Sequence, residues 1–138
     1  MRPAQSCDIY IDGASRGNPG PSGIGAAFFN RGSRPVKQLS KYLGETTNNV
    51  AEYLALIYAL QEALRDGYTA VSVKTDSELL ARQLSGQYRV RDSQLRLFHG
   101  LAQHLSAQFE HCAIAHIPRE QNIVADRLAG RAADQRAL

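Results

Sequence analysis

The sequence has few cysteines and no long apolar segment, and each absence excludes a class of protein. No apolar run in the 138 residues approaches the roughly 20 that cross a membrane, so we expect no membrane partner. Residues 1–6 lack the apolar stretch of a secretory signal peptide. Cys7 and Cys112 show no metal-site spacing and predict reduced, buried thiols. We therefore expect a cytoplasmic protein.

The rest of the composition is that of a globular domain. Hydrophobic residues make up 43% of the chain, enough to build a core at this length. No internal repeat, linker or low-complexity segment divides the chain, so we expect a single domain over residues 1–138. The formal net charge of +3 is a mild basic excess, which is compatible with a nucleic-acid partner but does not require one.

The order of the apolar patterns predicts an α/β fold. Residues 8–12, 23–30 and 36–43 have the pattern of three strands in an antiparallel meander. The period then becomes helical over 50–64, after N-cap residue types at 46–49 and before a closing Gly67. Strands at 71–76 and 111–117 follow helices, so right-handed crossovers should make them parallel to each other. Further helices are expected at 77–84, 93–108 and 122–135, with Leu95, Leu97, Phe98, Leu101, Leu105, Ile123, Leu128 and Ala132 buried.

Four acidic residues stand at strand ends and helix starts. Asp12 and Asp76 each end an expected strand, the end at which open α/β sheets bind ligands. Glu52 lies among apolar residues with no Lys or Arg within a helical turn. Asp126 is followed by Arg127, but adjacent side chains of a helix do not face each other. Because a buried charge must be paired or bind a metal, these oxygen ligands point to Mg²⁺, with Mn²⁺ as the substitute.

Each acid also has an ordinary structural explanation. Asp12 could be a turn residue before a glycine, and Asp76 could cap the helix that follows it. Glu52 could complete a capping box with Asn49, and Asp126 could be a first-turn acid favoured by the helix dipole. For any one acid the structural explanation is the simpler. Four such coincidences together favour a shared divalent-metal site.

The segments that carry these acids resemble the motifs of type 1 ribonuclease H. The resemblance rests on residues 10–15 (YIDGAS), 17–20 (GNPG), 47–52 (TNNVAE), 73–77 (VKTDS) and 118–129 (PREQNIVADRLA), in family order over nearly the whole chain. It implies a ribonuclease H-like fold, a mixed five-stranded sheet of three antiparallel and then two parallel strands with helices on both faces. It also implies an endoribonuclease that hydrolyses the RNA strand of RNA–DNA hybrids with two divalent cations, leaving 5′-phosphate and 3′-hydroxyl ends.

The resemblance also implies roles for individual residues. Asp12 would bridge two metal ions, and a His or Arg before the last acid would assist catalysis. His116 lies ten residues before Asp126 but within an expected strand, so we favour Arg119 for this auxiliary role and keep His116 as the alternative. The implied catalytic metal ligands are Asp12, Glu52, Asp76 and Asp126. The implied contacts with the RNA strand are Gly13, Ala14, Ser15 and Asn18. The implied contacts with the DNA strand are Thr47, Asn48 and Asn49, and Asn122 is a further implied substrate contact. Capping of the next helix is the alternative role for residues 47–49.

The chain departs from many family members in lacking an extra basic helix and loop. Only Arg89 and Arg91 remain in the expected loop 85–92, so we expect modest affinity for the hybrid. No obligate protein partner is evident, and we expect a monomer. The alternatives are another nuclease of this fold and a non-catalytic nucleic-acid-binding module. The Thr-Asn-Asn segment and small size argue against the first, and four phosphate-repelling carboxylates argue against the second.

Overall fold

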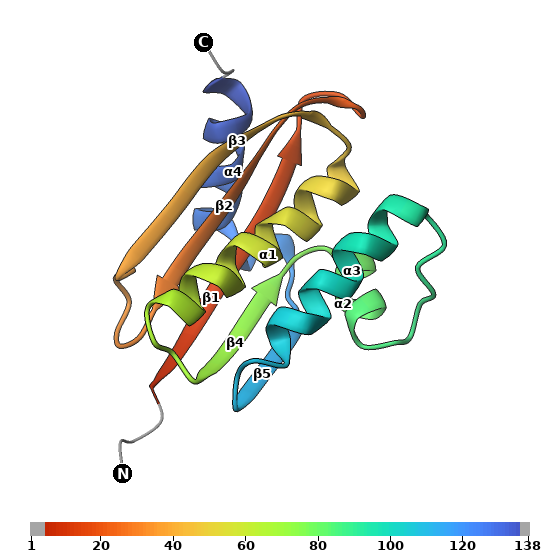
Figure 1. The fold of residues 1–138 in the computed structure, drawn as a ribbon. Helices are drawn as coiled ribbons and strands as arrows, with labels where there is room; N and C mark the ends of the chain where they lie inside the picture. Colours follow the sequence, from red (N-terminus) through yellow and green to blue (C-terminus); the bar gives the residue numbers. More distant parts are fainter. Residues whose placement is uncertain (1–4, 136–138) are drawn as a thin grey trace.

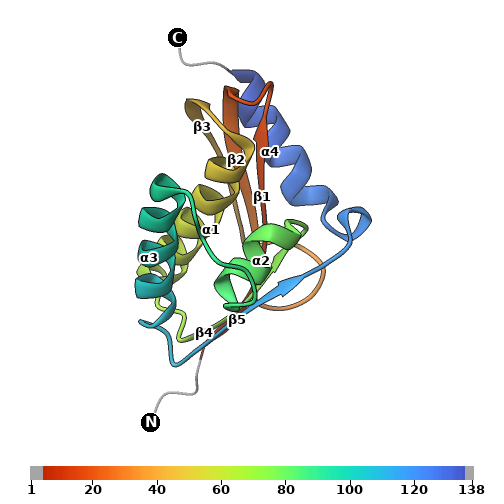
Figure 2. The same cartoon turned by 90° about the vertical axis from the view of Figure 1, so that its right-hand side faces the viewer.

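The computed structural model describes residues 5–135, which form a mixed five-stranded sheet with helices on both faces (Figures 1 and 2). Residues 1–4 and 136–138, the ends of the expected domain, lie outside the described part. The elements are β1 (Ser6–Ser15), β2 (Gly20–Phe29), β3 (Lys37–Thr46), α1 (Asn48–Arg65), β4 (Ala70–Thr75), α2 (Glu78–Leu84), α3 (Ser93–Ser106), β5 (His111–His116), the 3₁₀ turn η1 (Arg119–Gln121) and α4 (Ile123–Gln135).

The strands are arranged in the order β3-β2-β1-β4-β5, which confirms the predicted fold. β2 is antiparallel to β1 and β3, whereas β4 is parallel to both β1 and β5. Helices α1 and α3 cover one face of the sheet and α4 covers the other (Figure 2). β1 is therefore the central strand and carries its residues between the two helical layers.

Side chains on both faces of β1 contact other parts of the protein, which fits the central position of the strand. Ile9 and Ile11 are fully buried on the face that α1 covers. Tyr10 points to the opposite face, where its ring meets Phe29 edge-on at 5.5 Å between centroids. Both faces of the strand are thus occupied by apolar or aromatic side chains, which favours a position between two partner strands.

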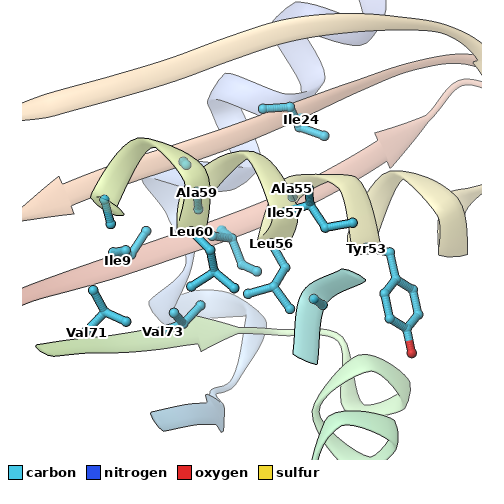
Figure 3. Close-up of a cluster of buried hydrophobic side chains, with 14 of the residues drawn as sticks. Ile9, Ile24, Tyr53, Ala55, Leu56, Ile57, Ala59, Leu60, Val71 and Val73 are labelled. Atoms are coloured by element: carbon cyan, nitrogen blue, oxygen red, sulfur yellow. The ribbon is translucent and has the colours of Figure 1, made fainter. Parts of the chain in front are cut away.

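Helix α1 supplies most of the core that packs against the sheet. Its aliphatic side chains, among them Leu56 and Leu60, meet Ile9, Val71 and Val73 from the strands (Figure 3). The helix begins where Thr47 accepts a hydrogen bond from the Val50 N–H, and positive-φ Gly67 follows its end, as predicted. No helix within residues 5–135 is long and apolar enough to cross a membrane.

Three residues expected to be buried are exposed instead. On α3, Leu97 is 75% exposed and Leu101 is 43% exposed. This helix turns only one side to α1, and that side carries positions 95, 98, 102 and 105. Ile123 is 58% exposed because it is the first residue of α4, and the buried face of that helix begins at Ala125. The helices were correctly predicted, but the apolar stripes assigned to their buried sides were too wide.

The positions of the two cysteines exclude a disulfide between them. Cys7 on β1 and Cys112 on β5 both pair with Val71 of β4, so one strand separates them. Two strand spacings amount to about 9–10 Å, beyond the roughly 7 Å limit for the Cα atoms of a disulfide. Burial raises the pKa of the Cys7 thiol to about 11, which disfavours the reactive thiolate. Cys7 is buried as predicted, whereas Cys112 is only partly buried.

Glycines on β2 allow α4 to lie close to the sheet, and this predicts a site of high sensitivity. A Cβ on Gly25 would lie 2.5 Å from the Ala129 N and would also overlap the Ala125 carbonyl. We expect Gly25→Ala to lower the free energy of unfolding by about 1–3 kcal/mol, because α4 must move outward. Urea unfolding would measure it. Gly100→Ala is the control: α3 leaves open space there, so it should stabilise by about 0.5–1 kcal/mol. Equal stability of the two variants would contradict this close packing.

Candidate active site

The register of the sheet brings Asp12 and Asp76 to the same edge. Parallel pairing of β1 with β4 ends at Ile11 and Thr75, and each is followed directly by an aspartate. Asp12 still belongs to the ladder between β1 and β2, where it lies opposite Gly25, and it is only 5% exposed. The site therefore starts where the ladder between β1 and β4 ends, at the carboxyl end of β4. β1 itself continues to Ser15 beside β2, so the predicted strand end at Asp12 was three residues too early.

Helix α1 contributes Glu52 through a close contact with β1. The Gly13 N–H donates a hydrogen bond to Glu52 Oε1 at 2.5 Å. A side chain on Gly13 would collide with this helix, since its Cβ would lie 2.5 Å from the Glu52 N. The helix is capped by Thr47, so the capping box of Glu52 with Asn49 is not formed. Glu52 instead turns its carboxylate toward the end of β1 and is 6% exposed.

Asp76 is not needed to cap the helix that follows it. Ser77 caps α2, because its Oγ accepts a hydrogen bond from the Leu80 N–H at 3.1 Å. The Asp76 carboxylate is thereby left to face Asp12 and Glu52. Oxygen atoms of these three acids lie within 4.8 Å of one another. Three carboxylates at this distance are a suitable ligand set for hard divalent cations.

Asp126 lies at the rim of this group. It occupies the first turn of α4, its side chain is 46% exposed, and its Oδ1 is 4.0 Å from Nη2 of Arg119. It lines the same cleft of about 510 Å³ as Asp12, Glu52 and Asp76. The structure thus brings all four predicted acids together, three as a tight group and the fourth beside it.

The tight group holds negative charge without a matching cation. Within residues 5–135, no ion pair involves Asp12, Glu52 or Asp76. Burial, followed by the charges of Glu52 and Asp76, raises the pKa of Asp12 to about 10. Burial also raises the pKa of Glu52 to about 7, although the Gly13 N–H opposes this rise. Bound divalent cations would remove this repulsion, so the residues fit a metal site.

The predicted substrate residues form the wall of the cleft beside the acids. Ala14, Ser15 and Asn48 line it together with Gly13, whose N–H is already engaged by Glu52. The Asn18 carboxamide oxygen accepts a hydrogen bond from the Asn48 N–H at 2.9 Å, which ties the β1–β2 loop to the start of α1. The side chain of Thr47 serves as the helix cap, and Asn49 is exposed outside the cleft lining.

Asn122 does not have the exposed position expected of a substrate contact. It is 1% exposed, and its Nδ2 donates to the Ile11 carbonyl at 2.8 Å. Its own carbonyl accepts from the Asp126 N–H at 3.1 Å. The residue therefore joins the first turn of α4 to the end of β1. No local sequence signal indicates this role, because the partner of the Asn122 side chain, Ile11, lies 111 residues away.

The basic residues that line the cleft are Arg119, which the sequence favoured for the auxiliary role, and Arg16, which was not expected. Arg119 lines the cleft, whereas His116 lines a separate pocket with Arg82 and Gln87. Arg16 was not singled out, yet it also lines the cleft, and its Nε donates to Asp134 of α4 at 2.8 Å. Only its place inside the glycine-rich segment could have indicated this from the sequence.

Comparisons with known proteins agree on one family. A family model described as reverse transcriptase-like matches residues 10–132. The ribonuclease H1 structure from the archaeon Halobacterium salinarum is 38% identical with a TM-score of 0.91, covering 95% of this chain and 99% of that one. LC11-RNase H1, solved in complex with an RNA/DNA hybrid, is 40% identical with a TM-score of 0.88, covering 94% and 97%. The bifunctional protein Rv2228c of Mycobacterium tuberculosis is 42% identical over 130 residues, which are 94% of this chain.

The mixed sheet with carboxylates where the β1–β4 ladder ends defines the ribonuclease H-like class of folds. Within that class, the chain belongs to the type 1 ribonuclease H family. The chain spans 36% of the length of the mycobacterial relative and 63% of that of the Halobacterium ribonuclease HI. The shared part is therefore the domain that carries the acids.

The raised pKa of Asp12 predicts how stability depends on pH without metal. Its pKa of about 10 in the folded state exceeds the roughly 3.9 of an unfolded Asp, so the folded protein binds this proton more tightly. The free energy of unfolding should then fall as pH rises above about 4. At neutral pH the folded parent must take up this proton, whereas Asp12→Asn needs none, so in chelator the variant should melt at a higher temperature than the parent. Mg²⁺ should raise the Tm of the parent more than that of the variant.

Thermal melts of both proteins from pH 4 to pH 8, with chelator and with Mg²⁺, measure these differences. Asp8→Asn is a suitable control, because Asp8 lies on the same strand with a 60% exposed side chain beside Lys74. A lower Tm for Asp12→Asn than for the parent in chelator would show that Asp12 stabilises its own turn.

Proposed function

We propose that the chain is an endoribonuclease that hydrolyses the RNA strand of RNA–DNA hybrids. The observation that carries this proposal is the convergence of Asp12, Glu52 and Asp76 within 4.8 Å, in a cleft shared with Asp126. Three of the four acids have no ion pair among the described residues and would repel a phosphate backbone, so the cleft fits nucleic acid only with metal bound. The hybrid-bound structure of LC11-RNase H1, 40% identical, supports the substrate.

Two Mg²⁺ ions, or Mn²⁺ as substitute, are the proposed cofactors. When bound, such ions supply a nucleophilic water and stabilise the leaving 3′-oxygen, so the products would carry 5′-phosphate and 3′-hydroxyl ends. Glu52, Asp76 and Asp126 all act on the pKa of Asp12, so Asp12 would contribute to both positions. Glu52, oriented by the Gly13 N–H, and Asp76 would complete one position, and Asp126 would complete the other.

The walls of the cleft provide contacts for the two strands of a hybrid. Gly13, Ala14 and Ser15 line the cleft with no side chain or a small one, which would admit an RNA backbone and its 2′-hydroxyl groups. The exposed side chains of Asn48 and Asn49 at the start of α1 would face the DNA strand. Because Asn18 bonds the Asn48 N–H, it would hold the two tracks at a constant separation.

Arg119 is the proposed auxiliary residue. Its side chain is 80% exposed, lines the acid cleft and lies 4.0 Å from Asp126, so it can reach a phosphate there without losing a buried partner. Its fixed positive charge would stabilise negative charge that develops on the phosphate. His116 ends β5 and lines a different pocket, which disfavours it for this role.

A cleavage panel tests the proposed function. The protein is incubated with an RNA–DNA hybrid, duplex DNA, duplex RNA and single strands, each with Mg²⁺ and with chelator. We expect cleavage of the RNA in the hybrid alone, only with Mg²⁺, and a loss of about 10²-fold or more for Asp12→Asn. Cleavage of duplex DNA would indicate another nuclease of this fold. Binding without any cleavage would indicate a non-catalytic module.

The auxiliary role predicts an order of effects. Arg119→Ala should lower kcat by about 10-fold or more, because a charge near the phosphate is lost, whereas His116→Ala should change it by less than about twofold. Steady-state kinetics on a defined hybrid with saturating Mg²⁺ compare them. Arg34→Ala is a matched control, an exposed arginine in the β2–β3 loop outside the acid cleft. If His116→Ala is the slower variant, the auxiliary role belongs to the histidine.

A further inference from the structure

Helix α2 is a short element that borders the acid cleft. It has seven residues and follows Asp76 after a single residue, and Ser77, Glu78 and Leu79 line the cleft. Only Leu80 and Gln83 of this helix are buried. The position of α2 therefore depends on these few buried side chains. Because Asp76 directly precedes the helix cap, a rotation of α2 would move Asp76.

A buried polar chain connects α2 with both neighbouring helices. The Tyr53 hydroxyl of α1 donates to Gln83 Oε1 at 2.6 Å, and both residues are almost fully buried. His99 Nε2 of α3 lies 3.1 Å from the backbone carbonyl oxygen of Gln83, within hydrogen-bond distance. The rings of Tyr53 and His99 also meet edge-on, with 6.5 Å between centroids. Three helices thus meet at one glutamine.

The direction of the Tyr53 side chain distinguishes it from the rest of the core. Tyr53 lies at one end of the aliphatic cluster, with its hydroxyl pointing away from the neighbouring aliphatic side chains (Figure 3). Burial raises the pKa of Tyr53 to about 12, so its hydroxyl remains a hydrogen-bond donor at neutral pH. A phenylalanine would satisfy the packing equally well, so the hydroxyl needs another explanation.

We infer that Tyr53, Gln83 and His99 are positioning residues that hold Asp76 at metal-binding distance from Glu52. Tyr53 directly follows Glu52 on α1. The same helix therefore positions Glu52 and, through the hydrogen bond from Tyr53 to Gln83, the helix that follows Asp76. At its start, α2 is held by the Thr75 Oγ1, which accepts from the Ser77 N–H at 3.0 Å. Asp76 is thereby fixed between an anchored strand end and the Tyr53–Gln83 hydrogen bond. This inference rests on the proposed metal-dependent function.

The test compares Mg²⁺ affinity in variants that keep the core volume. Tyr53→Phe removes only the donor, and we expect the Kd for Mg²⁺, measured by isothermal titration calorimetry without substrate, to rise about tenfold. The KM for the hybrid should stay within about twofold, and raising Mg²⁺ should recover activity. Tyr58→Phe is the matched control: Tyr58 lies on the same helix, and Lys41 contacts its ring face, not its hydroxyl.

Two further variants separate positioning from stability. Tyr53→Phe combined with Gln83→Leu removes donor and acceptor together, so it should regain stability while Mg²⁺ binding remains weak. His99→Phe keeps the ring and should weaken Mg²⁺ binding in the same direction but less. A parental Kd in Tyr53→Phe, or recovery of Mg²⁺ binding in the double variant, would overturn the positioning role. Absence of Mg²⁺ binding in the parent would instead refute the proposed function, and the inference with it.

Discussion

The hydrogen bond from the Gly13 N–H to Glu52 is the contact on which the acid site depends. It forms because position 13 has no side chain, so the α1 backbone can lie directly against β1. The same contact places a second carboxylate beside Asp12, whose burial and neighbours hold its pKa far above the usual range. An N–H donor favours the charged form of Glu52, so the backbone of β1 partly offsets the repulsion that the close packing creates.

Asn122 performs the complementary task on the other side of Asp12. Its carboxamide binds the Ile11 carbonyl, and its backbone carbonyl accepts the Asp126 N–H. The Ile11 carbonyl, just before Asp12, is thereby joined to the start of α4, which carries Asp126. The Gly13 N–H, just after Asp12, is joined to Glu52 of α1. The acid group is held by hydrogen bonds to the main chain of the central strand, a part of the protein that both helical layers keep rigid.

The parts of this arrangement that follow from local pattern were predictable from the sequence. The change from period 2 to a helical period near residue 48 gives the order of strands and helices. The aspartates after two strands and Glu52 in an apolar helix point to a shared acid site, whereas the mixed five-stranded sheet was implied by the family resemblance. The buried face of α3 was not predictable to the residue, because Leu97 and Leu101 satisfy helical spacing as well as Phe98 and Leu105 do. Only the position of α1 decides between these stripes. Asn122 and Arg16 were misjudged or missed for a similar reason, because their partners lie more than a hundred residues away in sequence.

The two helices that carry Glu52 and Asp126 cover opposite faces of the sheet, which explains why the acids differ in exposure (Figure 2). α1 crosses β1 directly, so Glu52 is enclosed, whereas α4 packs mainly on β2 and reaches the cleft only with its first turn, where Asp126 is half-exposed. Side chains from both layers can meet only where the sheet ends, since elsewhere the strands separate them. The end of the β1–β4 ladder is therefore where the acids of both layers can meet around one cleft, and a buried pair with a partly buried and a half-exposed acid follows from that geometry.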